Sequence, residues 1–305
     1  MFRRLRQLLV AMAASLLLCG PVAAGEPGVL VLGRISDDPA AHYDQLTPLL
    51  DYVVPRMRDV GIREGRVLMA RDTRQMESYM RRGRVDWVTE TSASAMLLET
   101  RADARALLLT ERSGVDAYHT VFIARRDSGI SSLADLRGRS IAFQNANSAS
   151  AYFVPAMALM AEGLPLEILL SPFDRPAEGS AGYLFARSEF NISTWVHKGL
   201  VDAGAFSNLD WESMQRMPDS YRQDLVAFHV TDDYPRALEM VRGDLSPEVA
   251  ERLREVLADA ANDPAASEAL QRFFGTTRFL PVDADTRRSL DVLRAGVVRV
   301  VEVLE

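Results

Sequence analysis

Two short segments rich in hydroxyl side chains are the parts of this sequence best suited to binding chemistry. They are Val-Thr-Glu-Thr-Ser-Ala-Ser at 88–94 and Asn-Ala-Asn-Ser-Ala-Ser at 145–150. In each, an apolar strand pattern ends and a helix pattern begins. A helix N-terminus carries unpaired N–H groups and the positive end of the helix dipole, and nearby hydroxyls add donors. This combination binds tetrahedral anions without lysine or arginine, so both segments are candidate anion sites.

Helix capping is the alternative explanation for each segment. Serine and threonine are common caps, and one junction of this kind is explained by capping alone. Two such junctions, one in each half of the alternating pattern, favour a shared cleft. The small residues Ala93, Ala149 and Ala151 would let a ligand approach the backbone. In α/β sheets these junctions open at the carboxyl ends of the strands, where ligands bind.

The side-chain patterns of common enzyme mechanisms are missing. The 4 histidines show no i, i+4 pairing and no H-E-x-x-H context, so a zinc site is unsupported. Lys198 is the only lysine and lies in no P-loop pattern, and no G-x-S-x-G nucleophile elbow occurs. We therefore expect a protein that is not an enzyme and that holds no metal and no cofactor.

Strand and helix patterns alternate around the two hydroxyl-rich junctions. Strands are expected at 29–33, 67–70, 85–88, 106–109, 118–124, 141–143 and 201–205. Helices are expected at 48–57, 73–82, 92–100, 132–138, 148–162 and 189–197, with further helices beginning at 246, 263 and 285. This spacing implies an α/β fold with mainly parallel sheets covered by helices on both faces.

One sequence element occurs twice. Arg-Gly-Arg-Val-Asp-Trp-Val at 82–88 is similar to Lys-Gly-Leu-Val-Asp-Ala-Gly at 198–204. Each combines a helix end, a glycine and a Val-Asp pair that opens a strand. Either two lobes of similar construction face each other, or a common helix-to-strand turn recurs by chance. The sequence leaves both interpretations open.

Residues 1–24 have the pattern of a secretory signal peptide. Three arginines precede an apolar run at 8–18, and the small residues Val-Ala-Ala at 22–24 close the segment. The run is about half as long as a membrane span, which disfavours an uncleaved anchor. We expect export to the periplasm and cleavage near Ala24. The sole cysteine, Cys19, follows the large Leu18, so lipid anchoring is the less favoured alternative.

The expected mature chain is acidic and free of thiols. Loss of the three leader arginines changes the formal net charge from -7 to about -10. This charge argues against nucleic acid and anionic membranes as partners. An anionic ligand must therefore be held by local groups. Without cysteine the mature chain has no disulfide, and we expect it to be a monomer.

The segment 118–155 resembles periplasmic substrate-binding proteins of phosphate, phosphite and phosphonate ABC transporters. The strongest part is Asp-Ser-Gly-Ile-Ser-Ser-Leu-Ala-Asp-Leu-Arg-Gly-Arg at 127–139, followed by Ile-Ala-Phe at 141–143. Next comes Ser-Ala-Ser-Ala-Tyr-Phe-Val-Pro at 148–155, where the family tends to have S-T-S-G-Y/F-L-V-P. The two Val-Asp elements also match.

The resemblance implies a two-lobe type II periplasmic binding protein. Its mainly parallel sheets would be flanked by helices, and two crossover hinge strands would let the lobes close on a ligand. Residues 25–117 with 228–305 would form lobe 1, and residues 118–227 would form lobe 2.

The resemblance also suggests site residues. Ser148 and Ser150 match the family's phosphonate-binding hydroxyls, Tyr118 matches a crossover tyrosine, and Glu189 matches an acidic residue that follows a histidine. Ser188 stands in place of that histidine, and Ala149 replaces the middle threonine of S-T-S, so the ligand could differ from the family's. The predicted ligand-binding set is Glu90, Thr91, Ser94, Tyr118, His119, Ser148, Ala149, Ser150, Tyr152 and Glu189.

The function expected from these features is capture of a small oxyanion, phosphonate-, phosphite- or phosphate-like, in an interlobe cleft for an ABC importer. The alternative is the same fold acting as the ligand-sensing periplasmic partner of a two-component sensor kinase. A third hypothesis, a periplasmic hydrolase of phosphorus esters, has no nucleophile–base pair or metal cluster to support it.

Overall fold

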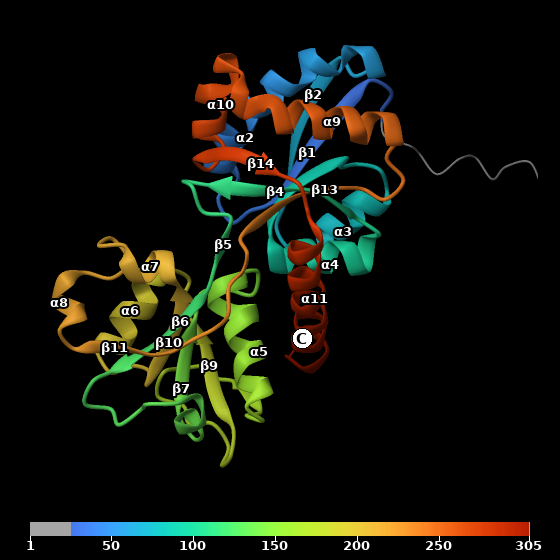
Figure 1. The fold of residues 1–305 in the computed structure, drawn as a ribbon. Coiled ribbons are helices and arrows are strands. Elements are labelled where there is room, and N and C mark those ends of the chain that lie inside the picture. The colour runs from blue at the N-terminus through green and yellow to red at the C-terminus, as the bar shows by residue number, and fades with distance from the viewer. Residues whose placement is uncertain (1–25, 305) are drawn as a thin grey trace, which may run out of the picture.

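The computed structural model describes residues 26–304, which form two α/β lobes that are each built on one six-stranded sheet (Figure 1). The expected signal peptide at 1–24, including Cys19, lies outside the described residues. No helix within 26–304 is long and apolar enough to span a membrane.

The first sheet has the strand order β14-β4-β13-β3-β1-β2. Its strands are β1 (Val29–Ile35), β2 (Glu64–Ala70), β3 (Trp87–Thr91), β4 (Arg105–Arg112), β13 (Ala237–Val241) and β14 (Thr276–Leu280). Strand β1 is parallel to β2 and β3, whereas β13 is antiparallel to both β3 and β4.

Helices cover both faces of the first sheet (Figure 1). One face carries α2 (Pro39–Val53), α9 (Pro247–Asp259) and α10 (Ser267–Arg272), whose apolar side chains form a core with Leu30, Leu32 and Trp87. The other face carries α3 (Thr73–Arg81) and α4 (Ser92–Ala102). Short 3₁₀ turns span Val54–Val60, Ala260–Asn262 and Pro264–Ala266.

The second sheet has the strand order β11-β6-β10-β7-β9-β8. Its strands are β6 (Thr120–Arg125), β7 (Ser140–Phe143), β8 (Leu166–Ile168), β9 (Ala181–Phe185), β10 (Ala203–Ser207) and β11 (Leu225–Val230). Its helices are α5 (Val154–Ala161), α6 (Glu189–His197), α7 (Asn208–Glu212) and α8 (Asp219–Arg222), with a 3₁₀ turn at Leu133–Leu136 and a π turn at Ala149–Phe153. Strands β8, β9, β7 and β10 form a parallel series. The expected α/β class with mostly parallel strands is confirmed.

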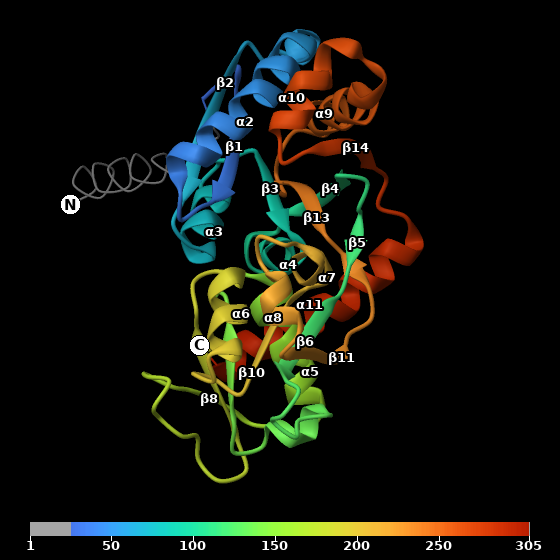
Figure 2. The ribbon, with the colours of Figure 1, turned by 90° about the vertical axis from the view of Figure 1, so that its left-hand side faces the viewer.

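Two strands cross between the lobes, as expected for this fold. Strand β5 (Ala117–Tyr118) leads from β4 to β6, and β12 (Tyr234–Pro235) leads back from β11 to β13. They pair antiparallel with Tyr118 opposite Tyr234, and Figure 2 shows both connections side by side between the lobes. A third link was not expected: α11 (Ala284–Leu304) packs against α4 of one lobe and α5 of the other (Figure 1).

The expected lobe boundary at 227/228 falls inside a strand. Strand β11 continues to Val230 and pairs with β6 up to that residue. We therefore propose that the second lobe extends from β6 through β11, with β5 and β12 as the crossing strands. Helix α11 is assigned to neither lobe alone, because it contacts both.

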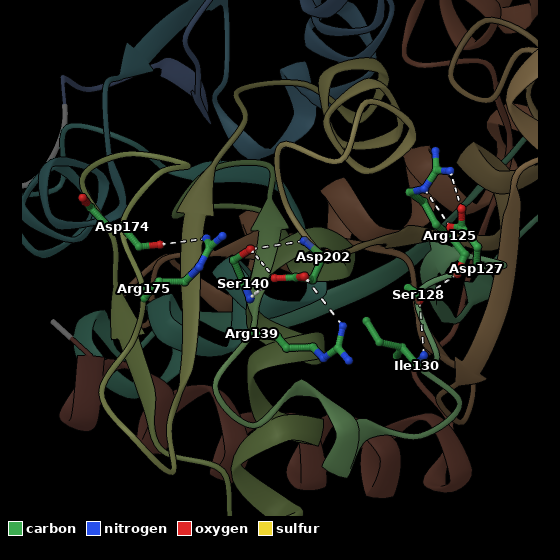
Figure 3. Close-up of polar contacts among 9 residues, drawn as sticks. All are labelled: Arg125, Asp127, Ser128, Ile130, Arg139, Ser140, Asp174, Arg175 and Asp202. Atoms are coloured by element: carbon green, nitrogen blue, oxygen red, sulfur yellow. Dashed lines mark hydrogen bonds and ion pairs between the residues drawn. The ribbon is translucent and has the colours of Figure 1, made fainter.

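The repeated Val-Asp element makes the same contacts in each lobe, so it marks a shared construction. In the first lobe, Asp86 Oδ2 accepts the backbone N–H of Val31 at 2.8 Å. In the second, Asp202 Oδ2 accepts both the N–H and the hydroxyl of Ser140 at 2.9 Å (Figure 3). Each carboxylate ties the start of one strand to its neighbour, and each also contacts an arginine.

The segment 127–139, which carries the strongest family resemblance, is scaffold. Arg125 contacts Asp127 through Nε at 2.9 Å, and the Ser128 hydroxyl accepts the N–H of Ile130 at 3.2 Å (Figure 3). Ser132 and Asp135 then form a reciprocal capping box. The segment contributes no side chain to the interlobe cavity described below.

Replacing Asp202 with alanine should destabilise the second lobe. The substitution leaves the buried N–H of Ser140 without its acceptor, which costs about 1–3 kcal/mol of unfolding free energy. Urea denaturation followed by circular dichroism measures the change. Asp219→Ala, which removes an exposed carboxylate 3.6 Å from Arg222, is the control and should have little effect. Equal midpoints for Asp202→Ala and the parent would contradict the anchoring role.

Candidate anion-binding cleft

A cavity of about 660 Å³ lies between the lobes. Small-molecule sites are typically about 300–1,000 Å³. Its walls come from the carboxyl ends of β1, β3 and β4 and from the segments after β7, β9 and β10, where ligands bind in α/β sheets. The lining side chains include Arg34, Asp37, His42, Arg71, Glu90, Thr91, Arg112, Tyr118, Ser148, Ala149, Ser150, Arg187, Glu189, Asp210 and Arg236.

Arg34 on β1 and Arg112 at the end of β4 give the first lobe's wall its positive charge. Both are anchored on Thr89 of β3: Arg34 Nη1 donates to its backbone oxygen at 3.0 Å, and Arg112 Nη2 donates to its hydroxyl at 3.3 Å. Burial, together with the nearby charge of Arg34, lowers the pKa of Arg112 to about 9. Arg112 therefore remains charged at neutral pH.

Each of these arginines keeps an unused donor. The Nε atoms of Arg34 and Arg112 are buried and have no hydrogen-bond partner among residues 26–304. A buried donor without an acceptor costs free energy, and more so when it is charged. An anion with several oxygens supplies both the missing acceptor and the opposite charge. The pair is therefore suited to binding an oxyanion.

Two buried carboxyl groups support the arginine pair. Glu90 Oε1 accepts the N–H of Ile35 at 2.6 Å, and Glu239 Oε1 accepts the hydroxyl of Thr89 at 2.8 Å. Because the Thr89 hydroxyl donates to Glu239, its oxygen is free to accept from Arg112. Burial raises the pKa of both carboxyls, while the charge of Arg112 acts in the opposite direction.

Three further arginines line the cleft. Arg236, which follows β12, donates through Nη1 to the backbone oxygen of Arg112 at 2.8 Å, and burial lowers its pKa. Arg71 and Arg187 follow β2 and β9 and are exposed. Local cations thus surround a cavity in a protein whose overall charge is negative.

The second lobe contributes the hydroxyl-rich helix start. Ser148 is the N-cap, and its hydroxyl accepts the N–H of Ala151 at 3.2 Å. Ser148, Ala149 and Ser150 line the cleft. The helix is kinked at Ala151, where the backbone leaves the helical region inside a π turn. This turn presents the small residues at 149–151 together at the helix start.

A tyrosine and two carboxyl groups complete the wall. Burial raises the pKa of Tyr118 to about 12, so its hydroxyl stays protonated and can donate. Burial also raises the pKa of Glu189 and of Asp210, and the charge of Asp210 raises that of Glu189 further. Arg216 lies 3.7 Å from Glu189 and acts in the opposite direction.

Of the predicted ligand-binding residues, the structure places at the cleft Glu90, Thr91, Tyr118, Ser148, Ala149, Ser150 and Glu189. The other three lie elsewhere. Ser94 is buried inside α4, because the helix begins two residues earlier at Ser92. The His119 ring contacts Asp233 at 2.8 Å. Tyr152 lies in an aromatic cluster beside a second, smaller cavity.

The predicted site does not include the arginines of the cleft, because it rests on hydroxyls at helix starts. Both wall arginines close apolar strand patterns, in Val-Leu-Val-Leu-Gly-Arg at 29–34 and Leu-Leu-Leu-Thr-Glu-Arg at 107–112. A cation at the carboxyl end of a buried strand is a signal that could have identified them. Their proximity to each other is set by the sheet order, which was not predicted.

No group of three or more His, Cys, Asp or Glu side chains within 26–304 is arranged to hold a metal ion.

Two α/β lobes, two crossing strands and a cleft at the strand ends define a type II periplasmic binding protein. The family model for the ABC transporter phosphonate periplasmic substrate-binding protein matches residues 34–286. The chain belongs to this family, whose members bind a small ligand in the periplasm and work with an ABC permease.

Solved structures agree with this assignment. The chain is 56% identical to XAC2383 from Xanthomonas citri in a structure bound to chloride ion, with a TM-score of 0.87 over 90% of this chain and 99% of that one. A second XAC2383 structure, bound to ATP, is 55% identical with a TM-score of 0.87 and covers 91% of this chain and 100% of that one. PhnD1 from Prochlorococcus marinus (MIT 9301), in complex with methylphosphonate, shares the fold at 17% identity, with a TM-score of 0.64 over 90% of this chain and 100% of that one.

Replacing Arg34 or Arg112 with methionine should weaken anion binding by about 10- to 100-fold, because each change removes a charged donor from a desolvated wall. Isothermal titration calorimetry with phosphate, methylphosphonate and ATP measures the loss. Arg254→Met, on the outer helix α9, is the control and should bind as the parent does. Unchanged affinity in both wall variants would remove the arginine pair from the site.

Proposed function

We propose that this protein is an exported solute-binding protein that captures a phosphorus oxyanion, or the phosphoryl group of a larger solute, for an ABC importer. The observation that carries the proposal is the pair Arg34 and Arg112, whose buried Nε donors are unpaired at the strand ends that line the cleft. Phosphoryl and phosphonyl groups present several charged oxygens on one centre and match such donors.

The two lobes would supply different parts of the cradle. Arginines from β1 and β4 neutralise charge, while the helix start at Ser148–Ser150 adds neutral N–H and hydroxyl donors. A ligand that contacts both walls favours the closed arrangement of the lobes, because only that arrangement satisfies both sets of donors.

The relatives bound to chloride, ATP and methylphosphonate are consistent with an anion-selective wall. The cavity volume of about 660 Å³ accommodates more than one phosphonyl group. We therefore include phosphate, phosphonates and nucleotide phosphates in one ligand class, to be separated by experiment.

A thermal-shift panel tests this function. The protein without residues 1–24 is screened against phosphate, methylphosphonate, ATP, sulfate and chloride. A ligand well above its Kd raises the melting temperature by mass action. We expect phosphate, methylphosphonate or ATP to give the largest shift, and small-angle scattering to show a smaller radius of gyration with that ligand. No shift with any phosphorus compound would overturn the proposal.

The double variant Ser148→Ala, Ser150→Ala should weaken binding of the ligand identified by the panel by about 10-fold or more, because it removes two hydroxyl donors at the helix start. Calorimetry measures the change. The variant Ser131→Ala removes an exposed hydroxyl in the scaffold segment at 127–139 and is the matched control. If the double variant binds as tightly as this control, the hydroxyls are caps alone.

The carboxyl group of Glu189 should make anion binding depend on pH. Its raised pKa means that it becomes neutral as pH falls, and above that pKa its charge repels an anion. Sulfate stays fully charged while this carboxyl titrates, so its affinity should rise as pH falls through the raised pKa of Glu189. Glu189→Gln should increase the affinity for sulfate at pH values above the pKa of Glu189. It should weaken the binding of monoprotonated phosphate, whose O–H loses a carboxylate acceptor.

His42 also lines the cleft and gains charge as pH falls, and its pKa is lowered by burial and by Arg34. Glu189→Gln should therefore remove only part of the pH dependence. His42→Gln is the control and should keep the part that depends on Glu189. A sulfate titration with the same pH profile in Glu189→Gln and the parent would place Glu189 outside the site.

A further inference from the structure

The ring of Phe274 contacts both arginines of the cleft wall. Phe274 lies in the turn between α10 and β14, far along the chain from β1 and β4. The guanidinium carbon of Arg34 lies 4.4 Å from the ring centroid, and that of Arg112 lies 4.5 Å from it. One aromatic ring therefore has two guanidinium groups over it, which is a cation–π arrangement at each.

The backbone of this turn is held in an uncommon conformation. Phe274 has φ 56 and Gly275 has φ 65, and Ser113, directly after Arg112, has φ 52. The N–H of Ser113 donates to the oxygen of Gly275 at 2.8 Å, which fixes the turn against the end of β4. A non-glycine residue in this region is strained, and such strain persists only where the surroundings impose it.

Core packing explains only part of the position of the ring, which packs against the edge of the core formed by α2, α9 and α10. The preceding Phe273 is fully buried and belongs to the core formed by α2, α9 and α10. Phe274 is only partly buried. One side of its ring meets the core, with a centroid 5.4 Å from that of Phe273, and its other neighbours are the two wall arginines and His42, whose ring lies 5.7 Å from its own. The left-handed turn thus places Phe273 inside the core and Phe274 at the edge of that core, in contact with the arginines of the cleft wall.

The ring and Thr89 together define where the guanidinium groups lie. Thr89 accepts one N–H from each arginine at its edge, and Phe274 supports each guanidinium on its face. With these contacts made, the Nε donors stay unpaired. Thr89 and Phe274 thereby hold the positive charges of the two arginines close together without neutralising them.

We propose that Phe274 is a positioning residue for anion binding, which holds the guanidinium groups of Arg34 and Arg112 so that their remaining donors serve one anion. This inference rests on the proposed function. A side chain of similar volume without a ring would fill the same space and would leave both arginines free to turn away or to pair with nearby carboxylates.

The test compares Phe274→Leu and Phe274→Met with Phe274→Tyr, which keeps the ring. Calorimetry with phosphate and with ATP should show about a 10-fold loss for the leucine and methionine variants and near-parental affinity for the tyrosine variant. Phe279→Leu is the matched control, because Phe279 is a buried ring in the neighbouring strand that packs 6.2 Å from Phe273. Parental affinity in both the leucine and the methionine variant would overturn the proposal.

A double-mutant cycle separates positioning from general stability. In a background that already carries Arg34→Met and Arg112→Met, Phe274→Leu should have no further effect on the residual affinity for phosphate. An equal loss in both backgrounds would show that the ring acts on the fold and not through the arginines, and would overturn the proposal.

Side-chain NMR of the ligand-free protein keeps this inference distinct from the proposed function. Protons of Arg34 and Arg112 next to the ring should show ring-current shifts that disappear in Phe274→Leu. If no phosphorus compound binds the parent, the proposed function fails, and these shifts still decide whether the ring holds the arginines. Identical arginine shifts in the parent and the leucine variant would overturn the positioning role.

Discussion

The structure depends on keeping two guanidinium groups close together and partly out of water. Charged groups are costly to desolvate unless each is paired or hydrogen-bonded. Arg34 and Arg112 lie on strands separated by β3 and β13 in the sheet, and each intervening strand supplies a support. Strand β3 contributes Thr89, which accepts a hydrogen bond from each arginine, and β13 contributes Glu239, which orients the threonine hydroxyl. The positive wall therefore depends on the side-by-side arrangement of β4, β13, β3 and β1 in the sheet.

The two walls of the cleft differ in kind. The first lobe offers most of the positive charge, whereas the second adds Arg187, neutral donors and the two carboxyl groups of Glu189 and Asp210, whose pKa values are raised. Affinity and selectivity can thus be tuned separately. Under the proposed function, the arginines would attract any anion, and the carboxyls would discriminate between anions that carry a proton and anions that do not.

Local signals in the sequence predicted elements well where a cap and a stop were both present. Helix α6 has the expected bounds, because Ser188 caps it and Gly199 follows its end. The Val-Asp element also marked equivalent strand anchors in the two lobes. Strands β9 and β13 were missed because each is a short buried run of five residues without a clear alternation of apolar and polar side chains. The proximity of Arg34 and Arg112 was beyond sequence reasoning, since it depends on β13 lying between β3 and β4.

That strand order also constrains when the protein becomes functional. Strand β13 inserts between β3 and β4, although the entire second sheet separates it from them along the chain. A nascent chain that has reached Val230 contains every strand of the second sheet, while β3 and β4 still have open edges facing each other. Such non-local pairing is slow to form and leaves edges exposed to wrong partners. A chain with this strand order would keep the facing edges of β3 and β4 unpaired until β13 is synthesised, and a folding helper that shields them would be most useful during that interval.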